Sequence, residues 1–156
     1  MLIDIASTTS EREQLWRAHA GELIRYATLL VGPNDAADVV SAAFLQTAAT
    51  RTDVANARAY LFRTVTNRAI DRQRSALRRQ ARDLHAVLPT VARTDDTDLD
   101  IRRAVARLSV QQRAVVYFTY WEDLTDDAVG ELLGISPGSV RQHLGRARLR
   151  LRKVLQ

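Results

Sequence analysis

The chain has no cysteine, and only three prolines, six glycines and few aromatic residues among its 156 positions. Without a thiol, disulfides, thiolate metal sites and cysteine nucleophiles are all excluded, which fits a reducing cytoplasm. No apolar run approaches the roughly 18 residues that a membrane-spanning helix needs, so we expect no membrane insertion. Residues 1–10 carry Asp4 and no long apolar stretch, which argues against a signal peptide.

Positive charge is present, and it is concentrated in two blocks. Residues 63–82 hold seven arginines and one acid, and residues 141–153 hold six basic residues and no acid. Between them, residues 114–140 hold five acids and no basic residue. Because a solvated helix usually mixes its signs, two segregated blocks indicate two contact surfaces for a polyanion, either nucleic acid or an anionic membrane. A matching face of exposed large apolar residues is missing, which disfavours the membrane.

Hydrophobic residues make up 46% of the chain and recur at steps of three and four. This spacing predicts helices nearly throughout, and no strand-like alternation of useful length is present. Gly32-Pro33-Asn34 ends the first helix, and Asn34 or Asp35 is expected to cap the second. A third helix is predicted over 57–79. The predicted fold class is all-α.

The helical periodicity fails between residues 83 and 98, where Pro89 and a Thr-Asp-Asp-Thr stretch occur. We interpret this segment as a flexible linker. It would join two small domains, an N-terminal helical bundle at 8–82 and a C-terminal helix-turn-helix domain at 99–156. Two helices are predicted at the start of the second domain, over 99–108 and 111–121.

The strongest local pattern lies between Leu124 and Lys153. Thr125 is a favourable N-cap, and Gly134 stands where a helix ends in the left-handed conformation. Ser136 then caps a second helix with Pro137 at its first position, where proline is tolerated. An inward stripe follows on that helix, formed by Val140, Leu144, Ala147 and Leu151. This layout is that of a helix-turn-helix, whose second helix enters the DNA major groove.

Away from that stripe, the second helix carries residues suited to DNA. Arginine and glutamine recognise guanine and adenine edges, and glycine allows close approach to the groove. The candidate DNA-contact set is Ser136, Gly138, Ser139, Arg141, Gln142, Arg146 and Arg148, and the residues suited to phosphates are Arg148, Arg150, Arg152 and Lys153. The alternative is an ordinary helical hairpin with a solvated basic face.

The basic helix near residue 60 forms a second candidate surface. Its polar face is expected to contain Arg63, Thr64, Asn67, Asp71 and Arg74. The neighbouring aromatic residues Tyr60 and Phe62 either stack against bases or belong to the core, with the arginines solvated.

These segments resemble the extracytoplasmic-function (ECF) sigma factors of bacteria, which are of the sigma-70 type. The resemblance is carried by DAADVVSAAFL at 35–45, by AYLFR at 59–63 with NRAID at 67–71, and by the stretch from Leu108 to Arg141 with RAR at 146–148. It covers roughly 11–82 and 99–154.

The resemblance implies a promoter-specific initiation factor with no catalytic activity, cofactor or metal. Its partners would be core RNA polymerase, promoter DNA and an anti-sigma factor, in the bacterial cytoplasm. The second domain would bind the −35 element. The first would bind and open the −10 element, with residues 51–58 capturing an unstacked base and with the set Tyr60, Arg63, Thr64, Asn67, Arg68, Asp71 and Arg74 on the DNA. The polymerase-binding set would be Asp35, Asp38, Ser41, Ala42 and Leu45.

One departure from the family concerns the polymerase-binding helix. Ala37, Ser41 and Ala42 stand where Glu, Gln and Glu are common in the family. Polymerase binding is then either weaker or rests on Asp38 and Leu45 with different partners, and our hypothesis is that binding survives.

Two other function classes were weighed. A stand-alone helix-turn-helix regulator would need a ligand-binding or dimerisation segment, and the N-terminal half offers a second basic surface instead. An enzyme is disfavoured because no phosphate loop or nucleophile motif is present and the histidines, at 19, 85 and 143, are scattered. His19 lies within an apolar stripe and is interpreted as structural.

Overall fold

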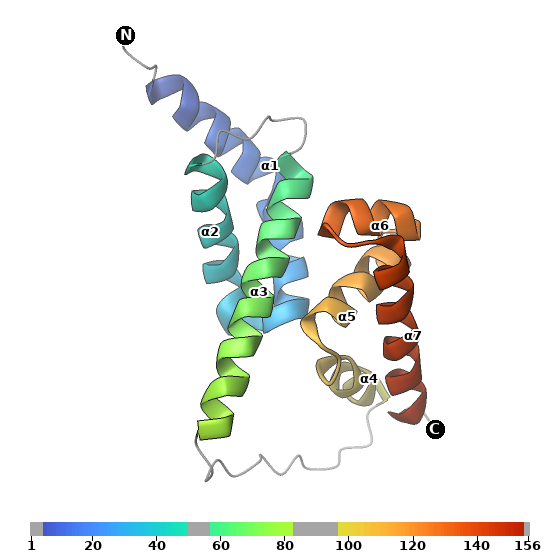
Figure 1. Cartoon of the computed structure of the whole chain (residues 1–156). Helices are drawn as coiled ribbons and strands as arrows, with labels where there is room; N and C mark the ends of the chain where they lie inside the picture. Colours follow the sequence, from blue (N-terminus) through green and yellow to red (C-terminus); the bar gives the residue numbers. More distant parts are fainter. Residues whose placement is uncertain (1–4, 50–56, 83–96, 155–156) are drawn as a thin grey trace. The chain divides into compact units, whose positions relative to one another are not determined.

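The structure is a computed structural model that describes residues 5–49, 57–82 and 97–154 (Figure 1). Within these ranges the chain is helical with short turns and contains no strand, which confirms the all-α prediction. The helices are α1 (Ile5–Val31), α2 (Pro33–Ala49), α3 (Ala57–Arg82), α4 (Thr97–Ala106), α5 (Val110–Val116), the π-helix η2 (Tyr117–Trp121), α6 (Asp126–Leu133) and α7 (Pro137–Val154).

The chain divides into two compact units, residues 1–69 and 70–156, and the division falls within α3. The expected linker lies almost wholly outside the described residues, as does most of the segment expected to capture a base. The helix predicted over 99–108 begins two residues earlier, at Thr97, and ends at Ala106. Helix ends vary by a residue or two because the terminal turns are the least constrained.

The turn between α1 and α2 depends on Gly32. Its φ of 86° is left-handed, and its N–H donates to the carbonyl oxygen of Thr28 at 2.9 Å. Helix α2 begins directly afterwards at Pro33, so the predicted caps at Asn34 and Asp35 are wrong. Proline is suited to the first helical position because the N–H it lacks would have no partner within the helix.

The core of the first unit is built around Tyr26 and Phe62, both fully buried. Their rings meet edge to face, with centroids 5.1 Å apart. The Thr66 hydroxyl donates to the Phe62 carbonyl at 2.7 Å, and so it must accept from the Tyr26 hydroxyl at 2.6 Å. The Tyr26 and Thr66 hydroxyls thus both donate their protons within the core. Phe62 is therefore a core residue, and its alternative role as a base-stacking group is excluded.

The second unit confirms the predicted helix-turn-helix. The Thr125 hydroxyl accepts from the Ala128 N–H at 3.3 Å, Gly134 ends α6 with a φ of 70°, and the Ser136 hydroxyl accepts from the Ser139 N–H at 3.1 Å. The inward residues Val140, Leu144 and Ala147 of α7 are buried, and α7 packs on α5 and α6 (Figure 1). These caps and the turn are local, so this part of the fold follows directly from the sequence.

The helix predicted over 111–121 is two elements. Ser109 and Gln112 form a capping box at the start of α5, and α5 passes at residue 117 into the π-helix η2. The Glu122 N–H donates to the Tyr117 carbonyl at 3.2 Å, five residues back, instead of four.

Candidate nucleic-acid interface

The predicted contact residues of α7 lie at the surface of the second unit. Exposed side chains are those of Ser136, Arg141, Gln142, Arg146 and Arg148, together with the glycine at 138. Ser139 is half-buried, and its hydroxyl lies 3.0 Å from that of Ser136. The two serines are thus engaged in capping α7. This leaves the arginines and Gln142 as the groups that project far enough to meet base edges.

Arg141 has an acidic neighbour on the preceding helix. Its Nη1 lies 3.6 Å from Oδ2 of Asp126, in the first turn of α6. The arginine side chain is largely exposed, so the pair contributes about 0–1 kcal/mol to folding. Its effect is on geometry, because it holds the guanidinium over the turn, close to the N-terminal end of α7 that enters the groove in a helix-turn-helix.

Two other arginines of α7 are tied to different elements of the unit. The Arg148 Nε–H donates to the Tyr120 hydroxyl at 2.7 Å, a contact that the sequence pattern did not indicate. Arg150 donates to the Gln112 side-chain oxygen at 3.2 Å and to the Arg107 carbonyl oxygen at 3.4 Å. Arg150 therefore links α7 to α5 and to the end of α4 within the unit, so it has a structural role besides the expected phosphate contact.

On α3, the structure separates the predicted polar face into exposed and buried members. Arg63, Asn67, Asp71 and Arg74 are exposed, Tyr60 and Arg68 are half-buried, and Thr64 is only 6% exposed. Placing Thr64 on the DNA-facing surface was therefore wrong: its position faces inward beside Val65 and Leu61, and threonine is small enough to be buried there. The Arg68 Nη2 donates to Gln46 of α2 at 3.1 Å.

The predicted polymerase-binding residues of α2 differ in exposure. Asp38, Ser41 and Leu45 are exposed, and Leu45 shows 73% of its surface, whereas Asp35 and Ala42 are half-buried. Ser41 and Leu45 line a groove of about 600 Å³ between α1 and α2. The remaining lining is Thr9, Arg12, Glu13, Trp16, Arg17, Phe44 and Ala48.

The aromatic part of that groove was not predicted. Trp16 and Phe44 stand at the helical spacing of core residues, yet Trp16 is 39% exposed and its ring meets that of the half-buried Phe44 at a centroid distance of 4.7 Å. An accessible aromatic cluster beside an exposed leucine is typical of a protein-binding surface. Their spacing alone could not reveal it, because an apolar position on a helix fits a core and a groove equally well.

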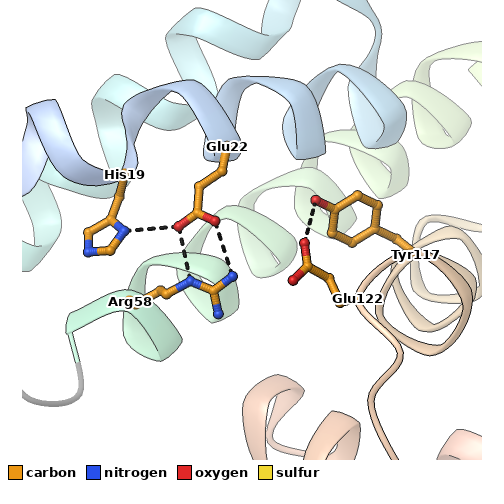
Figure 2. A network of polar contacts seen from close by, with 5 residues as sticks. All are labelled: His19, Glu22, Arg58, Tyr117 and Glu122. Atoms are coloured by element: carbon orange, nitrogen blue, oxygen red, sulfur yellow. Dashed lines mark hydrogen bonds and ion pairs between the residues drawn. The ribbon is translucent and has the colours of Figure 1, made fainter.

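A polar network fixes the first turn of α3 to α1 (Figure 2). Arg58 donates from Nε and Nη2 to the two carboxylate oxygens of Glu22, at 3.0 and 3.1 Å, and His19 Nδ1 lies 2.9 Å from the same carboxylate. Burial acts to raise the pKa of Glu22, but the hydrogen bonds and charges of Arg58 and His19 outweigh it and hold the pKa below 4.5. His19 is thus a structural residue, as predicted. Figure 2 also shows a separate hydrogen bond in the second unit, from the Tyr117 hydroxyl to Glu122 at 3.1 Å.

The described ranges also bear on a metal site and on a membrane span. Among those residues, no group of three or more His, Asp or Glu side chains is arranged to hold a metal ion. None of the described helices is both long enough and apolar enough to cross a membrane.

Family models match two separate parts of this chain. Residues 15–82 match the family model "Sigma-70 region 2", and residues 98–151 match "Sigma-70, region 4". A helical unit followed by a helix-turn-helix unit, each matching one region, defines a sigma-70 type transcription factor.

Curated relatives narrow the class. The ECF RNA polymerase sigma factor SigM of Mycobacterium tuberculosis is 33% identical over 150 residues, covering 92% of this chain and 76% of that protein. The RNA polymerase sigma-E factor of Streptomyces coelicolor is 33% identical over 158 residues, covering 93% and 86%. The chain belongs to the ECF sigma factor family.

Solved structures show the same fold. The sigma factor RpoE of Bartonella quintana, solved with the anti-sigma factor NepR, has a TM-score of 0.67 at 21% identity and covers 92% of this chain and 95% of its own. CnrH, solved with the cytosolic domain of CnrY, has a TM-score of 0.64 at 23% identity and covers 94% and 88%.

Proposed function

We propose that this chain directs core RNA polymerase to specific promoters, recognising the −35 element through α6 and α7 and opening the −10 element through α3. The observation that carries the proposal is the exposed arginine and glutamine set of α7, presented by a confirmed helix-turn-helix on a chain that belongs to the ECF sigma factors. Catalysis is left to the polymerase, and the chain itself acts as no enzyme. Family membership disfavours a stand-alone regulator.

The domain assignment follows the matched regions. Residues 8–82 would contact the polymerase and the −10 element, residues 83–98 would connect the two domains, and residues 99–156 would bind the −35 element. For the −10 contact we retain Tyr60, Arg63, Asn67, Arg68, Asp71 and Arg74, and leave out the buried Thr64.

Polymerase binding is assigned to the exposed face of α2. Asp38 supplies charge, Ser41 a hydroxyl, and Leu45 an exposed apolar side chain at the edge of the groove. The shortened side chains at 37, 41 and 42 remove polar reach from this face but leave Leu45 accessible, which supports the hypothesis that binding survives.

Co-elution of the purified chain with core polymerase at low salt tests this assignment. Leu45→Glu should abolish co-elution because it places a charge at the edge of an apolar groove, whereas Leu77→Glu, an equally drastic change at an exposed leucine of α3, should not. Failure of the unsubstituted chain to co-elute would overturn polymerase binding itself, and equal loss in both variants would overturn the assignment to α2.

Regulation by an anti-sigma protein in the bacterial cytoplasm is part of the same proposal. Its support is that the sigma factor RpoE, which has the same fold, was solved with the anti-sigma factor NepR. Competition between a candidate anti-sigma protein and core polymerase for the purified chain tests it.

A further inference from the structure

The contact between Tyr120 and Arg148 joins two elements that the sequence keeps 28 residues apart. The Arg148 Nε–H donates to the Tyr120 hydroxyl at 2.7 Å, and the guanidinium carbon lies 5.7 Å from the centre of the tyrosine ring. Tyr120 is 58% exposed, so this ring contributes little to the core. The tyrosine side chain is therefore available to act at the surface of the unit.

The π-helix fixes where Tyr120 stands. The Glu122 N–H reaches back to the Tyr117 carbonyl at 3.2 Å, and the Leu124 N–H reaches the Phe118 carbonyl at 3.0 Å. The Tyr117 hydroxyl closes the same turn on the Glu122 carboxylate at 3.1 Å. A widened turn of this kind rotates the residues that it contains relative to an α-helix, and such turns are frequent at functional sites.

Arg148 lies on the face of α7 that carries the base-reading candidates. It follows Arg141 by seven residues, which is close to two full helical turns, so both side chains project from the same side. Val140, Leu144 and Ala147 are buried on the adjoining face of α7, so Arg148 projects from the edge of the packed surface. In a helix-turn-helix the first turns of the second helix meet base edges, and a group two turns further along is placed to meet the sugar-phosphate backbone.

The hydrogen-bond chemistry suits a phosphodiester. Tyr120 uses only the single Nε–H of Arg148, which leaves the four N–H donors of the two terminal nitrogens for a phosphate. Because Tyr120 already restricts the guanidinium, less side-chain freedom is lost when DNA binds.

We propose that Tyr120 and Arg148 form a phosphodiester-binding subsite beside the recognition part of α7, with Arg148 as the phosphate ligand and Tyr120 as its positioning residue. The inference rests on the proposed DNA-binding function. It extends the interface from α7 to the π-helix η2, an element that no sequence motif assigned to DNA.

Because a phosphate contact is independent of sequence, the test uses the full chain and a short fluorescent DNA duplex of arbitrary sequence. Anisotropy titrations between about 50 and 200 mM salt give the affinity and its salt dependence. The variants are Tyr120→Phe, Arg148→Ala and the double substitution. Tyr117→Phe is the matched control, since it also removes one tyrosine hydroxyl from the π-helix but leaves Arg148 untouched.

Arg148→Ala should lower the salt slope by about 0.9, the value for one released counterion. Tyr120→Phe should weaken binding about three- to tenfold, as expected for loss of a hydrogen bond to a charged group. The double variant should bind no more weakly than Arg148→Ala, because Tyr120 acts through Arg148. Tyr117→Phe should stay within about twofold of the unsubstituted chain, since the hydrogen bond that it removes, from the Tyr117 hydroxyl to Glu122, does not involve Arg148.

The outcomes separate the inference from the function. If Arg148→Ala weakens binding and Tyr120→Phe does not, or if the two effects simply add, Tyr120 is no positioning residue. An unchanged salt slope in Arg148→Ala would overturn the subsite. If the unsubstituted chain and its polymerase complex fail to bind any duplex, the proposed function fails instead.

Discussion

Gly130 of α6 provides the most direct test of the helix-turn-helix geometry. A Cβ added there would lie 2.6 Å from the Ile135 carbonyl oxygen, 3.4 Å from the Pro137 nitrogen and 3.5 Å from the Ser136 carbonyl carbon. All three atoms are backbone, and the Ile135 N–H donates to the Gly130 carbonyl at 2.9 Å, so the turn cannot retreat without losing this bond. Gly130 thus allows the turn to close against α6.

The expected size of the effect follows from two opposing terms. Overpacking costs about 1–3 kcal/mol. Alanine in place of glycine inside a helix returns about 1 kcal/mol. Because the added Cβ would lie only 2.6 Å from a backbone oxygen, the cost falls in the upper half of its range, about 2–3 kcal/mol, and Gly130→Ala should lower the free energy of unfolding by about 1–2 kcal/mol.

Gly145 supplies the control. It is also helical, but a Cβ there would have no atom within 4 Å. Gly145→Ala should raise the free energy of unfolding by about 1 kcal/mol. It should also weaken duplex binding if α7 approaches the groove closely on this side, because the added methyl lies among Arg141, Gln142 and Arg148.

Denaturant unfolding followed by tryptophan fluorescence measures both variants. A Trp16→Phe background leaves Trp121 as the single tryptophan, so that the signal reports the second unit alone. Gly130→Ala at or above the stability of the unsubstituted chain would refute the close approach. A destabilised Gly145→Ala would refute the open surface at that position.

Four further predictions concern base readout, backbone strain and pH. Arg141→Ala and Gln142→Ala should each reduce discrimination at defined base pairs by about 1–3 kcal/mol in binding to selected duplexes, and equal losses on scrambled DNA would count against direct readout. Asp123 has a φ of 53°, which glycine adopts without strain. Asp123→Gly should therefore raise the free energy of unfolding by up to about 1 kcal/mol, and a lowered free energy of unfolding would contradict this. Because the folded pKa of Glu22 is lowered, its contribution to stability should be complete above pH 4.5 and lost as the pH falls through the folded pKa. Glu22→Gln should therefore make the free energy of unfolding depend less on pH over that range, and an unchanged pH dependence would exclude the effect. Burial, and then the charge of Arg146, lowers the pKa of His143 below 6.5, so the imidazole binds a proton more tightly in the unfolded chain than in the folded one. The free energy of unfolding should therefore fall as the pH drops below 6.5, and His143→Gln should remove that dependence.

The helix-turn-helix was predictable because its signals are local. Thr125, Gly134 and Ser136 each act on backbone groups within a few residues, and the structure places each where its chemistry required. The all-α class followed in the same way from periodicity.

Features that depend on tertiary contacts were missed. Thr64 is polar and falls at an exposed-looking spacing, but the packing of α3 buries it. Gly130 looked like an ordinary helical residue, and only the return of the turn shows why a side chain is excluded. The bonds of Arg148 to Tyr120 and of Arg150 to Gln112 join residues 28 and 38 positions apart, so the sequence predicted both arginines as DNA contacts and did not predict these bonds.

Transcription in vitro tests the central claim most directly. Core polymerase and the purified chain, with no other sigma factor, would be given a library of genomic fragments, and the 5′ ends of the transcripts mapped. We predict transcripts that depend on the chain and whose upstream regions share two elements, near −35 and −10. Absence of transcripts that depend on the chain, or a requirement for a second sigma factor, would contradict the account.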